Sequence, residues 1–229
     1  GNALYESLRA PHMSTTLLHP STKHDPATTP ADNASRPVSH KRAGWMSWPR
    51  LALVTSAVLL AVSNLFPYWE MRLNAPQYPG GLFLTLFTHD LKGDVSEIDG
   101  LNHYIGMMPL GDAAGFERSI AMFAMAAFVV MGILAGVLAN RKWSWLALPI
   151  IIFPFAFLAD MYYWLRYAGQ NLDPTAALSG AVKPFTPTLL GHGVVGQFST
   201  DAMVQAGFWI AAAAALLALA GLVGRLRSG

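Results

Sequence analysis

The sequence predicts an all-α integral membrane protein: a four-transmembrane-helix bundle with a small, partly β periplasmic cap formed by two long loops. Of the 229 residues, 53% are hydrophobic and 12% are charged, whereas about a quarter of the residues in a soluble domain carry a charge. Four apolar runs each approach the roughly 20 residues that a bilayer requires. Two long segments with turn-forming residues separate these runs and supply the cap.

The region before the first apolar run is expected to contribute no folded structure. Residues 1–12 read poorly as the start of a natural protein, so we interpret them as an expression remnant that precedes Met13. Residues 13–48 are rich in Ser, Thr, Pro and Ala and lack apolar periodicity, so they cannot bury enough surface to offset their ordering entropy. We expect a disordered tail, whose close, SHKRAGWMSWPR, has the basic and indole side chains typical of a membrane interface.

The membrane domain is expected over residues 49–225. Only the third of its spans contains a charged side chain, Asp160, and two prolines should bend the same span. Gly132 and Gly136 form a GxxxG motif in the second span, which we interpret as a site of helix packing within the bundle. The four spans are expected at about 51–68, 119–138, 144–165 and 203–223.

Basic residues indicate the orientation in the membrane. They lie before the first span, in the short turn between the second and third spans, and after the fourth: Lys41, Arg42, Arg50, Arg141, Lys142, Arg225 and Arg227. Lys and Arg near span ends favour the cytoplasmic side. We therefore expect a bacterial inner-membrane protein with both termini in the cytoplasm and with loops 69–118 and 166–202 in the periplasm.

Both periplasmic loops are expected to be folded. Side chains alternate with the period of a strand over 82–87, and 92–94 have turn chemistry. Residues 95–98 are then expected to return as a short second strand, followed by a short helix over about 101–108. In the second loop, prolines and glycines recur at intervals that preclude a long helix, so we expect it to lie against the first loop.

The stretch EIDGLNHYIGMMPL, residues 97–110, contains the sharpest candidate site. On a helix, His103 and Met107 would share a face, with Met108 beside them. Imidazole and thioether form a soft ligand set that suits copper, above all Cu(I). Further ligands to such a site would be Glu70, Met71 and His192. The alternative is that this stretch supports the fold or docks a partner, since methionine fills gaps well.

Asp160 is the second candidate. A charge at the bilayer centre costs at least about 2.5–3.5 kcal/mol, so an intramembrane carboxylate suggests a function. Asp160 lies near the outer end of its span, however, where that cost is lower. We favour a structural role, in which an ion pair with Arg72, Arg118 or Arg166 ties a loop to the bundle.

Missing residues and motifs exclude several kinds of chemistry. The chain has no cysteine, which removes disulfides, Fe–S clusters, thiolate metal sites and C-x-x-C-H haem attachment. No histidine lies in a predicted span, so paired axial ligands for an intramembrane haem are missing. There is no Walker A loop, nucleophile elbow or H-E-x-x-H motif. Because these motifs are missing, we expect a protein that is not an enzyme. The net charge is only +2, so we expect no nucleic-acid partner.

Elements of both loops resemble a known family. APQYPGGL and EIDGLNHYIGM in the first loop, and NLDPTAAL and KPFTPTLLG in the second, are similar to small bacterial multi-span membrane proteins associated with gene clusters for nitrous oxide reductase and related copper enzymes. The resemblance implies an accessory protein that serves a periplasmic copper enzyme through copper delivery, assembly or electron supply. It carries over only candidate positions, which are Glu97, Asn102, His103, Tyr104 and Met107.

Three functions remain open from the sequence. The leading one is a non-catalytic inner-membrane accessory protein whose periplasmic loops bind copper or dock a periplasmic copper enzyme. The second is a structural or docking subunit of a larger membrane complex. The third is a quinol-interacting electron-transfer module of the respiratory chain, with Asp160, Tyr163 and His103 near the outer interface. In each case we expect contact with the lipid bilayer and with a membrane or periplasmic protein partner.

Overall fold

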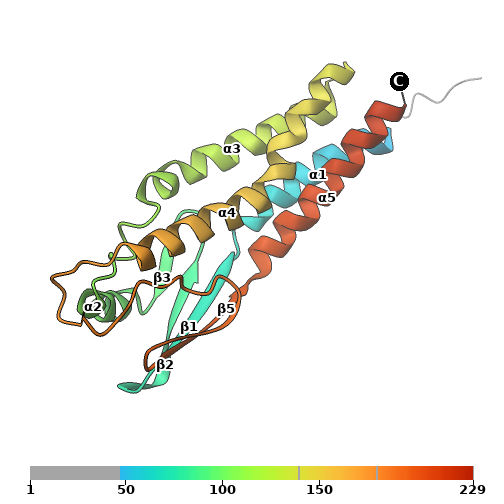
Figure 1. Cartoon of the computed structure of the whole chain (residues 1–229). Coiled ribbons are helices and arrows are strands. Elements are labelled where there is room, and N and C mark those ends of the chain that lie inside the picture. Colours follow the sequence, from blue (N-terminus) through green and yellow to red (C-terminus); the bar gives the residue numbers. More distant parts are fainter. Residues whose placement is uncertain (1–46, 139, 179, 229) are drawn as a thin grey trace, which may run out of the picture. The chain divides into compact units, whose positions relative to one another are not determined.

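The computed structural model describes residues 47–138, 140–178 and 180–228. The expected remnant over 1–12 and almost all of the expected tail over 13–48 therefore lie outside the described residues. Figure 1 shows how the described helices and strands are arranged. In chain order they are α1 (Trp48–Ser63), β1 (Trp69–Ala75), β2 (Tyr78–Leu86), β3 (Leu91–Gly93), α2 (Val95–Ile105), α3 (Gly115–Val137), the 3-10 helix η1 (Arg141–Ala147), α4 (Leu148–Gln170), β4 (Gly191–Val195), β5 (Phe198–Val204) and α5 (Ala206–Arg227).

Three described helices are long and apolar enough to cross a bilayer: α3, η1 continued by α4, and α5. α1 has 16 residues, which rise about 24 Å, whereas the hydrocarbon core of a bilayer is about 30 Å thick. The prediction of four spans is therefore wrong for the part of the chain that the structure describes. α1 ends early because the side chains of Ser63 and Asn64 both donate to Leu60 O and Pro67 follows, which disfavours further helix.

Small residues let the helices approach one another closely. A side chain at Gly132 would meet Ala57 Cβ at 2.9 Å, and one at Gly136 would meet Arg50 O at 2.9 Å. The GxxxG motif therefore packs α3 against α1 within the chain, as predicted. The face of α5 that lies in the bundle core is likewise built from small residues, which are Ala211, Ala214 and Ala218.

The two loops combine in one antiparallel sheet of five strands, in the order β3-β2-β1-β5-β4. In the central strand, β1, Trp69 lies opposite Leu86 of β2 on one side and Val204 of β5 on the other. The prediction of apolar helices with a β-containing part built from the two loops is therefore confirmed, whereas the all-α class is wrong, because the sheet is substantial. The strand predicted over 82–87 is confirmed within β2, but the strand predicted over 95–98 is wrong, because these residues begin α2.

Asp94 explains why the second predicted strand does not form. Its backbone N–H donates to Phe83 O at 2.8 Å, and its carboxylate accepts from Phe83 N–H at 2.8 Å. These two bonds use the backbone groups with which β2 would otherwise extend its pairing with β3. Gly93 has a φ of +105°, a conformation that favours glycine. The chain therefore leaves the sheet here and turns into α2.

The sheet has one buried face and one exposed face, because successive residues of a strand point to opposite sides. The exposed face carries Arg72, Phe83 and Met203. The buried face packs against α2 and against Phe157 and Met161 of α4, and its most buried residues are Trp69, Met71, Leu82, Leu84 and Ala202.

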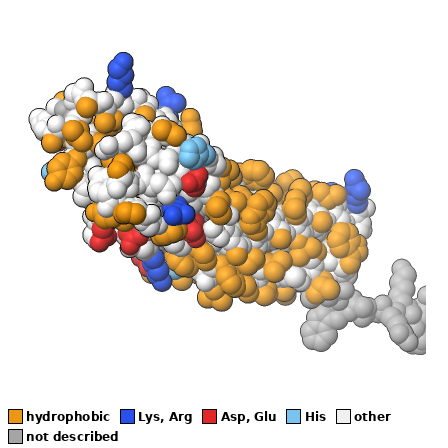
Figure 2. All heavy atoms as spheres, turned by 90° about the horizontal axis from the view of Figure 1, so that it is seen from below, with side chains coloured by type: hydrophobic (Ala, Val, Ile, Leu, Met, Phe, Trp, Pro, Cys, Tyr) orange, Lys and Arg blue, Asp and Glu red, His pale blue; other side chains and the backbone are white. Residues whose placement is uncertain are grey.

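Large apolar side chains are exposed along the three long helices. Phe123 of α3 is 80% exposed, Phe155 of α4 is 72% exposed and Leu216 of α5 is 70% exposed. Figure 2 shows hydrophobic side chains over most of the helical part of the molecule, whereas charged side chains gather over the part that bears the strands. An apolar surface of this kind is unfavourable in water and suits the hydrocarbon of a membrane. The helices therefore support a membrane location.

Candidate functional site

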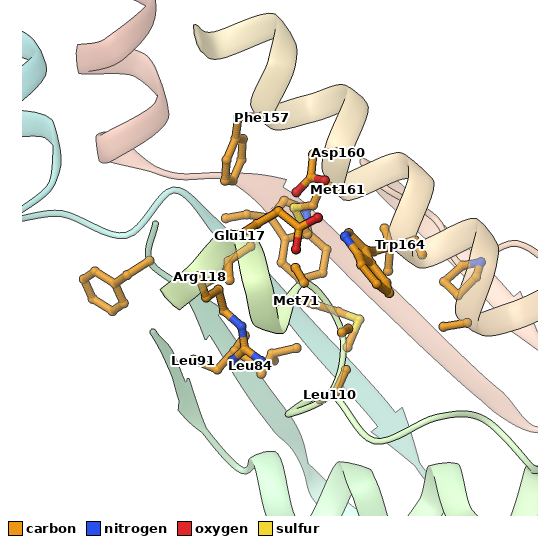
Figure 3. Close-up of a pocket in the computed structure, with 18 of the residues that line it drawn as sticks. Met71, Leu84, Leu91, Leu110, Glu117, Arg118, Phe157, Asp160, Met161 and Trp164 are labelled. Carbon is orange, nitrogen blue, oxygen red and sulfur yellow. The ribbon is translucent and has the colours of Figure 1, made fainter. Parts of the chain in front are cut away.

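A cavity of about 400 Å³ lies where the buried face of the sheet meets α2, α3 and α4. Figure 3 shows side chains from these elements converging on it, among them Met71 of β1, Leu84 of β2 and Met161 of α4. Most of its lining is apolar. Small-molecule sites in proteins usually have volumes of about 300–1,000 Å³ and apolar walls with a few polar groups. The cavity is therefore the best-formed candidate site in the described part of the chain.

Two polar side chains in the cavity wall carry a buried N–H donor that has no hydrogen-bond partner among the described residues. They are Asn102 of α2, through Nδ2, and Arg118 of α3, through Nε. Asn102 is the more enclosed, with 7% of its surface exposed. A third donor, Trp164 Nε1 of α4, lies beside the Asp160 carboxylate and interacts with it. The wall therefore offers the two unpaired N–H donors to a ligand.

Two carboxylates, Glu117 and Asp160, also line the cavity and lie close enough to repel each other. Among the described residues, neither forms an ion pair within 4.0 Å. The predicted pair between Asp160 and a loop arginine is therefore not present. Arg118 uses a terminal nitrogen to donate to Gly111 O, and Arg72 lies on the exposed face of the sheet, where it donates to a backbone carbonyl.

The predicted copper ligands do not share one helical face. α2 ends at Ile105 because Gly106 adopts the left-handed conformation, with φ +79°, and Met107 N–H donates back to Asn102 O at 2.8 Å. Met107 thus leaves the helix and lines the cavity, whereas His103 is exposed on α2 and Met108 is half-buried.

No group of three or more His, Asp or Glu side chains that could hold a metal ion occurs in residues 47–138, 140–178 and 180–228. A copper site at His103, Met107 and Met108 would therefore depend on thioether ligands. It stays a prediction. The three supplementary ligands are also spread apart, because Met71 lines the cavity, whereas Glu70 and His192 lie on the opposite face of the sheet.

The second loop lies against the end of α2, as expected. Asp173 N–H donates to Gly106 O at 2.7 Å, and Leu178 N–H donates to Tyr104 O at 2.9 Å. A side chain at residue 106 would meet Asp173 O at 2.6 Å, so this contact requires glycine. Two of the candidate positions in this region, Glu97 and Tyr104, are exposed.

The exposed face of the sheet carries a polar cluster that joins three strands. His192 Nδ1–H of β4 donates to Asp201 Oδ1 of β5 at 2.8 Å, and Asn74 Nδ2–H of β1 donates to Asp201 Oδ2 at 3.2 Å. The hydrogen bond from His192 is the main reason why the pKa of the Asp201 carboxyl lies below its usual value. Nearby, the Arg72 guanidinium lies 5.4 Å from the centre of the Phe83 ring.

The sequence identified some of the cavity residues and missed others. Asn102, Arg118, Met107 and Asp160 were candidates, although not for one site. Glu117 and Trp164 were missed, because a carboxylate at the start of a span and an indole near its end are ordinary features of a membrane interface. Glu117 and Trp164 come together because the strands of the sheet hold α2 over the start of α3 and the end of α4.

Comparison of the chain with protein-family models, with curated proteins and with solved structures finds no match. A functional assignment must therefore start from the geometry of the cavity and of the exposed sheet face, together with the resemblance of the two loops.

Proposed function

We propose that the protein is a non-catalytic accessory protein of the bacterial inner membrane, whose strand-bearing part lies in the periplasm and docks a periplasmic copper enzyme or supplies it with copper. The proposal rests on one observation: the basic residues lie at one end of the apolar helices, and the sheet lies at the other end. The link to a copper enzyme comes from the resemblance of both loops, which together build that sheet.

The contacts at the basic end support this orientation. Arg225 near the end of α5 donates to Ala135 O at 2.9 Å and to Leu138 O at 3.1 Å, at the end of α3. The start of α1 adjoins the same end of α5, because a side chain at Gly224 would meet Trp48. The basic residues near these three chain segments, which are Arg50, Arg141, Lys142, Arg225 and Arg227, therefore cluster at one end, and Lys and Arg are enriched on the cytoplasmic side.

The sheet lies at the other end of the helices. Tyr68 N–H, just before β1, donates to Leu86 O at 2.8 Å, and Gln205 N–H, just before α5, donates to Tyr68 O at 2.9 Å. The strands therefore begin where α1 has ended and finish where α5 starts. With the basic end in the cytoplasm, this end belongs in the periplasm.

Labelling of single cysteines tests the orientation directly, because the chain has none of its own. Gln197, between β4 and β5, and Ser228, after α5, are both exposed. A membrane-impermeant maleimide applied to intact spheroplasts should label the Gln197→Cys variant and leave the Ser228→Cys variant unlabelled until the membrane is broken. The reverse pattern would refute the proposed orientation.

The exposed sheet face is the surface that we assign to docking. Phe83 is 42% exposed and Met203 is 55% exposed, and both are held by paired strands beside Arg72, Asp201 and its bonded partners. Exposed aromatic, methionine and arginine side chains on a rigid support are typical of protein interfaces. The face is thus suited to a folded protein partner.

The docking test uses a periplasmic copper enzyme of the class that the resemblance of the two loops implies, produced together with this protein. We expect the double variant Phe83→Ala, Met203→Ala to lose most of the enzyme that copurifies with the wild type in mild detergent. Leu178→Ala, which truncates an exposed side chain on another loop, is the matched control and should retain it. Equal recovery with all three proteins would remove the sheet face from the proposal.

Copper binding is tested separately. Purified protein should bind Cu(I), and the triple variant His103→Ala, Met107→Ala, Met108→Ala should not. His89→Ala, which removes another exposed histidine of the same loop, serves as the control. Equal Cu(I) binding by the triple variant and the wild type would limit the proposal to docking.

A structural subunit of a larger membrane complex is the second candidate function. Exposed small residues on α3, such as Ala126 and Ala127, favour it, because small residues let another helix approach within the membrane. Under mild detergent, this function requires a stable complex that contains further membrane subunits. A monomer without such subunits would count against it.

A further inference from the structure

The cavity between the sheet and the helices has walls that suit the apolar chain of a lipid. Deep in the wall lie Leu84, Ile98 and Met125, all of which are buried. Its other sides include Ala121 and Ala124, on the half of α3 nearest the sheet. α3 is one of the helices that can cross a bilayer, so an apolar chain could pass between the cavity and the membrane without entering water.

The unpartnered donors show what kind of head group the cavity requires. Two buried donors in its wall, Asn102 Nδ2 and Arg118 Nε, have no partner among the described residues. An unsatisfied buried donor is unfavourable, and a ligand with acceptor oxygens would remove that penalty. Asn102, 7% exposed, lies on α2, so an acceptor bound there would sit beneath the sheet rather than at the surface.

The charges in the wall restrict the head group further. Glu117 and Asp160 repel an anion, since neither has an ion-pair partner within 4.0 Å among the described residues. The positively charged Arg118 guanidinium, in turn, repels a cation. A neutral group with carbonyl oxygens avoids both penalties, because the oxygens accept from the donors and no net charge is brought close to the carboxylates.

We propose that this cavity binds a neutral membrane lipid through its carbonyl oxygens, with the apolar chain lying along α3 and α4. Binding of a lipid in this cavity does not require that the exposed sheet face docks an enzyme or that the sheet lies in the periplasm. Two membrane components have this chemistry: an isoprenoid quinone, with its ring carbonyls, and a neutral acylglycerol, with its ester carbonyls. Either one would fill the cavity and satisfy the donors of two separate elements, α2 and α3, at once.

The experiment measures binding of radiolabelled decylubiquinone and dioleoylglycerol to the purified protein in detergent. Ala121→Phe places a large side chain in the cavity wall and should weaken binding by at least about tenfold, since filling the cavity removes the space for the ligand. Ala127→Phe puts the same side chain on the same helix, at an exposed position outside the cavity, and should bind like the wild type. Asn102→Leu removes one donor at similar volume and should weaken binding by about tenfold, the equivalent of about 1.4 kcal/mol.

Each outcome bears on the proposal. Saturable binding of decylubiquinone alone, lost in Ala121→Phe, identifies a quinone site, and the same result with dioleoylglycerol alone identifies an acylglycerol site. Binding of both probes that Ala121→Phe abolishes supports the shared carbonyl chemistry. Binding that is equal in wild type, Ala121→Phe and Asn102→Leu reflects partition into the detergent and overturns the proposal, as does binding of neither probe. If Ala121→Phe does not fold, Asn102→Leu alone decides between these outcomes.

Discussion

Tyr68 provides a quantitative test of the junction between the helices and the sheet. Its side chain is fully buried, its hydroxyl is 2.6 Å from Ser63 Oγ, and its ring packs against Phe153 and Phe157 at centroid distances of 5.9 and 5.1 Å. Burial raises the pKa of Tyr68 to about 12, although the Ser63 hydrogen bond offsets part of the shift. The phenolate is therefore disfavoured in the folded protein.

The predicted effect of Tyr68→Phe changes sign with pH. At neutral pH the substitution loses one buried hydrogen bond, which costs about 1 kcal/mol, and Ser63 retains its bond to Leu60 O at 2.6 Å. Because the folded pKa is raised, the wild type's advantage is fully present below the unfolded pKa and is lost as pH rises. A shift from 10.0 to about 12 corresponds to ~2.7 kcal/mol at completion. About half of this loss has accumulated near pH 11, where the two proteins should be equally stable.

The assay compares Tm and the free energy of unfolding for wild type and Tyr68→Phe in detergent, from about pH 8 to about pH 11.5. The wild type should be more stable at the lower pH, and the variant should lead by roughly 1 kcal/mol at the upper limit. Other tyrosines and lysines titrate in both proteins and cancel in the difference. A wild-type advantage that persists to the upper limit would show that Tyr68 is not buried at the junction as described.

Three further substitutions test other parts of the fold. Gly106→Ala should lower the free energy of unfolding by ~2 kcal/mol, which a lower Tm would reveal. The left-handed backbone disfavours alanine, and the new Cβ would meet Asp173 O at 2.6 Å. Arg225→Met should lower the free energy of unfolding by roughly 2 kcal/mol, since three hydrogen bonds to carbonyls at the end of α3 are lost; unchanged stability would contradict this role. Asp201→Asn should lower Tm at neutral pH, and the difference from wild type should vanish as pH falls below the usual carboxyl value of 3.8, because the His192 hydrogen bond lowers the Asp201 pKa and stabilises only the ionised form. A difference that stays constant in acid would refute this origin.

The helices were largely predictable from the sequence because membrane hydropathy is a strong signal. The spans expected at 119–138, 144–165 and 203–223 correspond to α3, α4 and α5. The predicted boundaries of the spans contain errors, because other secondary structure includes some of the residues at the span ends. Met203 and Val204 are apolar and were counted in the last span, but they pair with Glu70 and Trp69 in the sheet. Hydropathy alone does not distinguish a buried strand from the first turn of a helix.

The sheet was the main feature that the sequence did not predict. β1 follows directly on the span expected at 51–68, so its WEMRL segment carries no strand signal that is separate from the apolar run. β4 contains two glycines and β5 contains several polar residues, and β5 pairs with β1, which is far away in the sequence. Strand propensity is weak and depends on such partners. The cavity could not be predicted from the sequence for the same reason, because its donors come together only when the sheet holds α2 over α3 and α4.

The position of β5 has a consequence for biosynthesis. β1 leaves the ribosome early, but β5, its neighbour on one side in the sheet, is completed only when residue 204 has been made, after both helices of the α3–α4 hairpin. For this interval one edge of β1 has unpaired backbone groups, and exposed edges of this kind recruit other chains. A chain interrupted before β5 would keep that edge open permanently. We therefore expect such fragments to be cleared by proteolysis or to aggregate, and the nascent protein to need protection until its last helix is inserted.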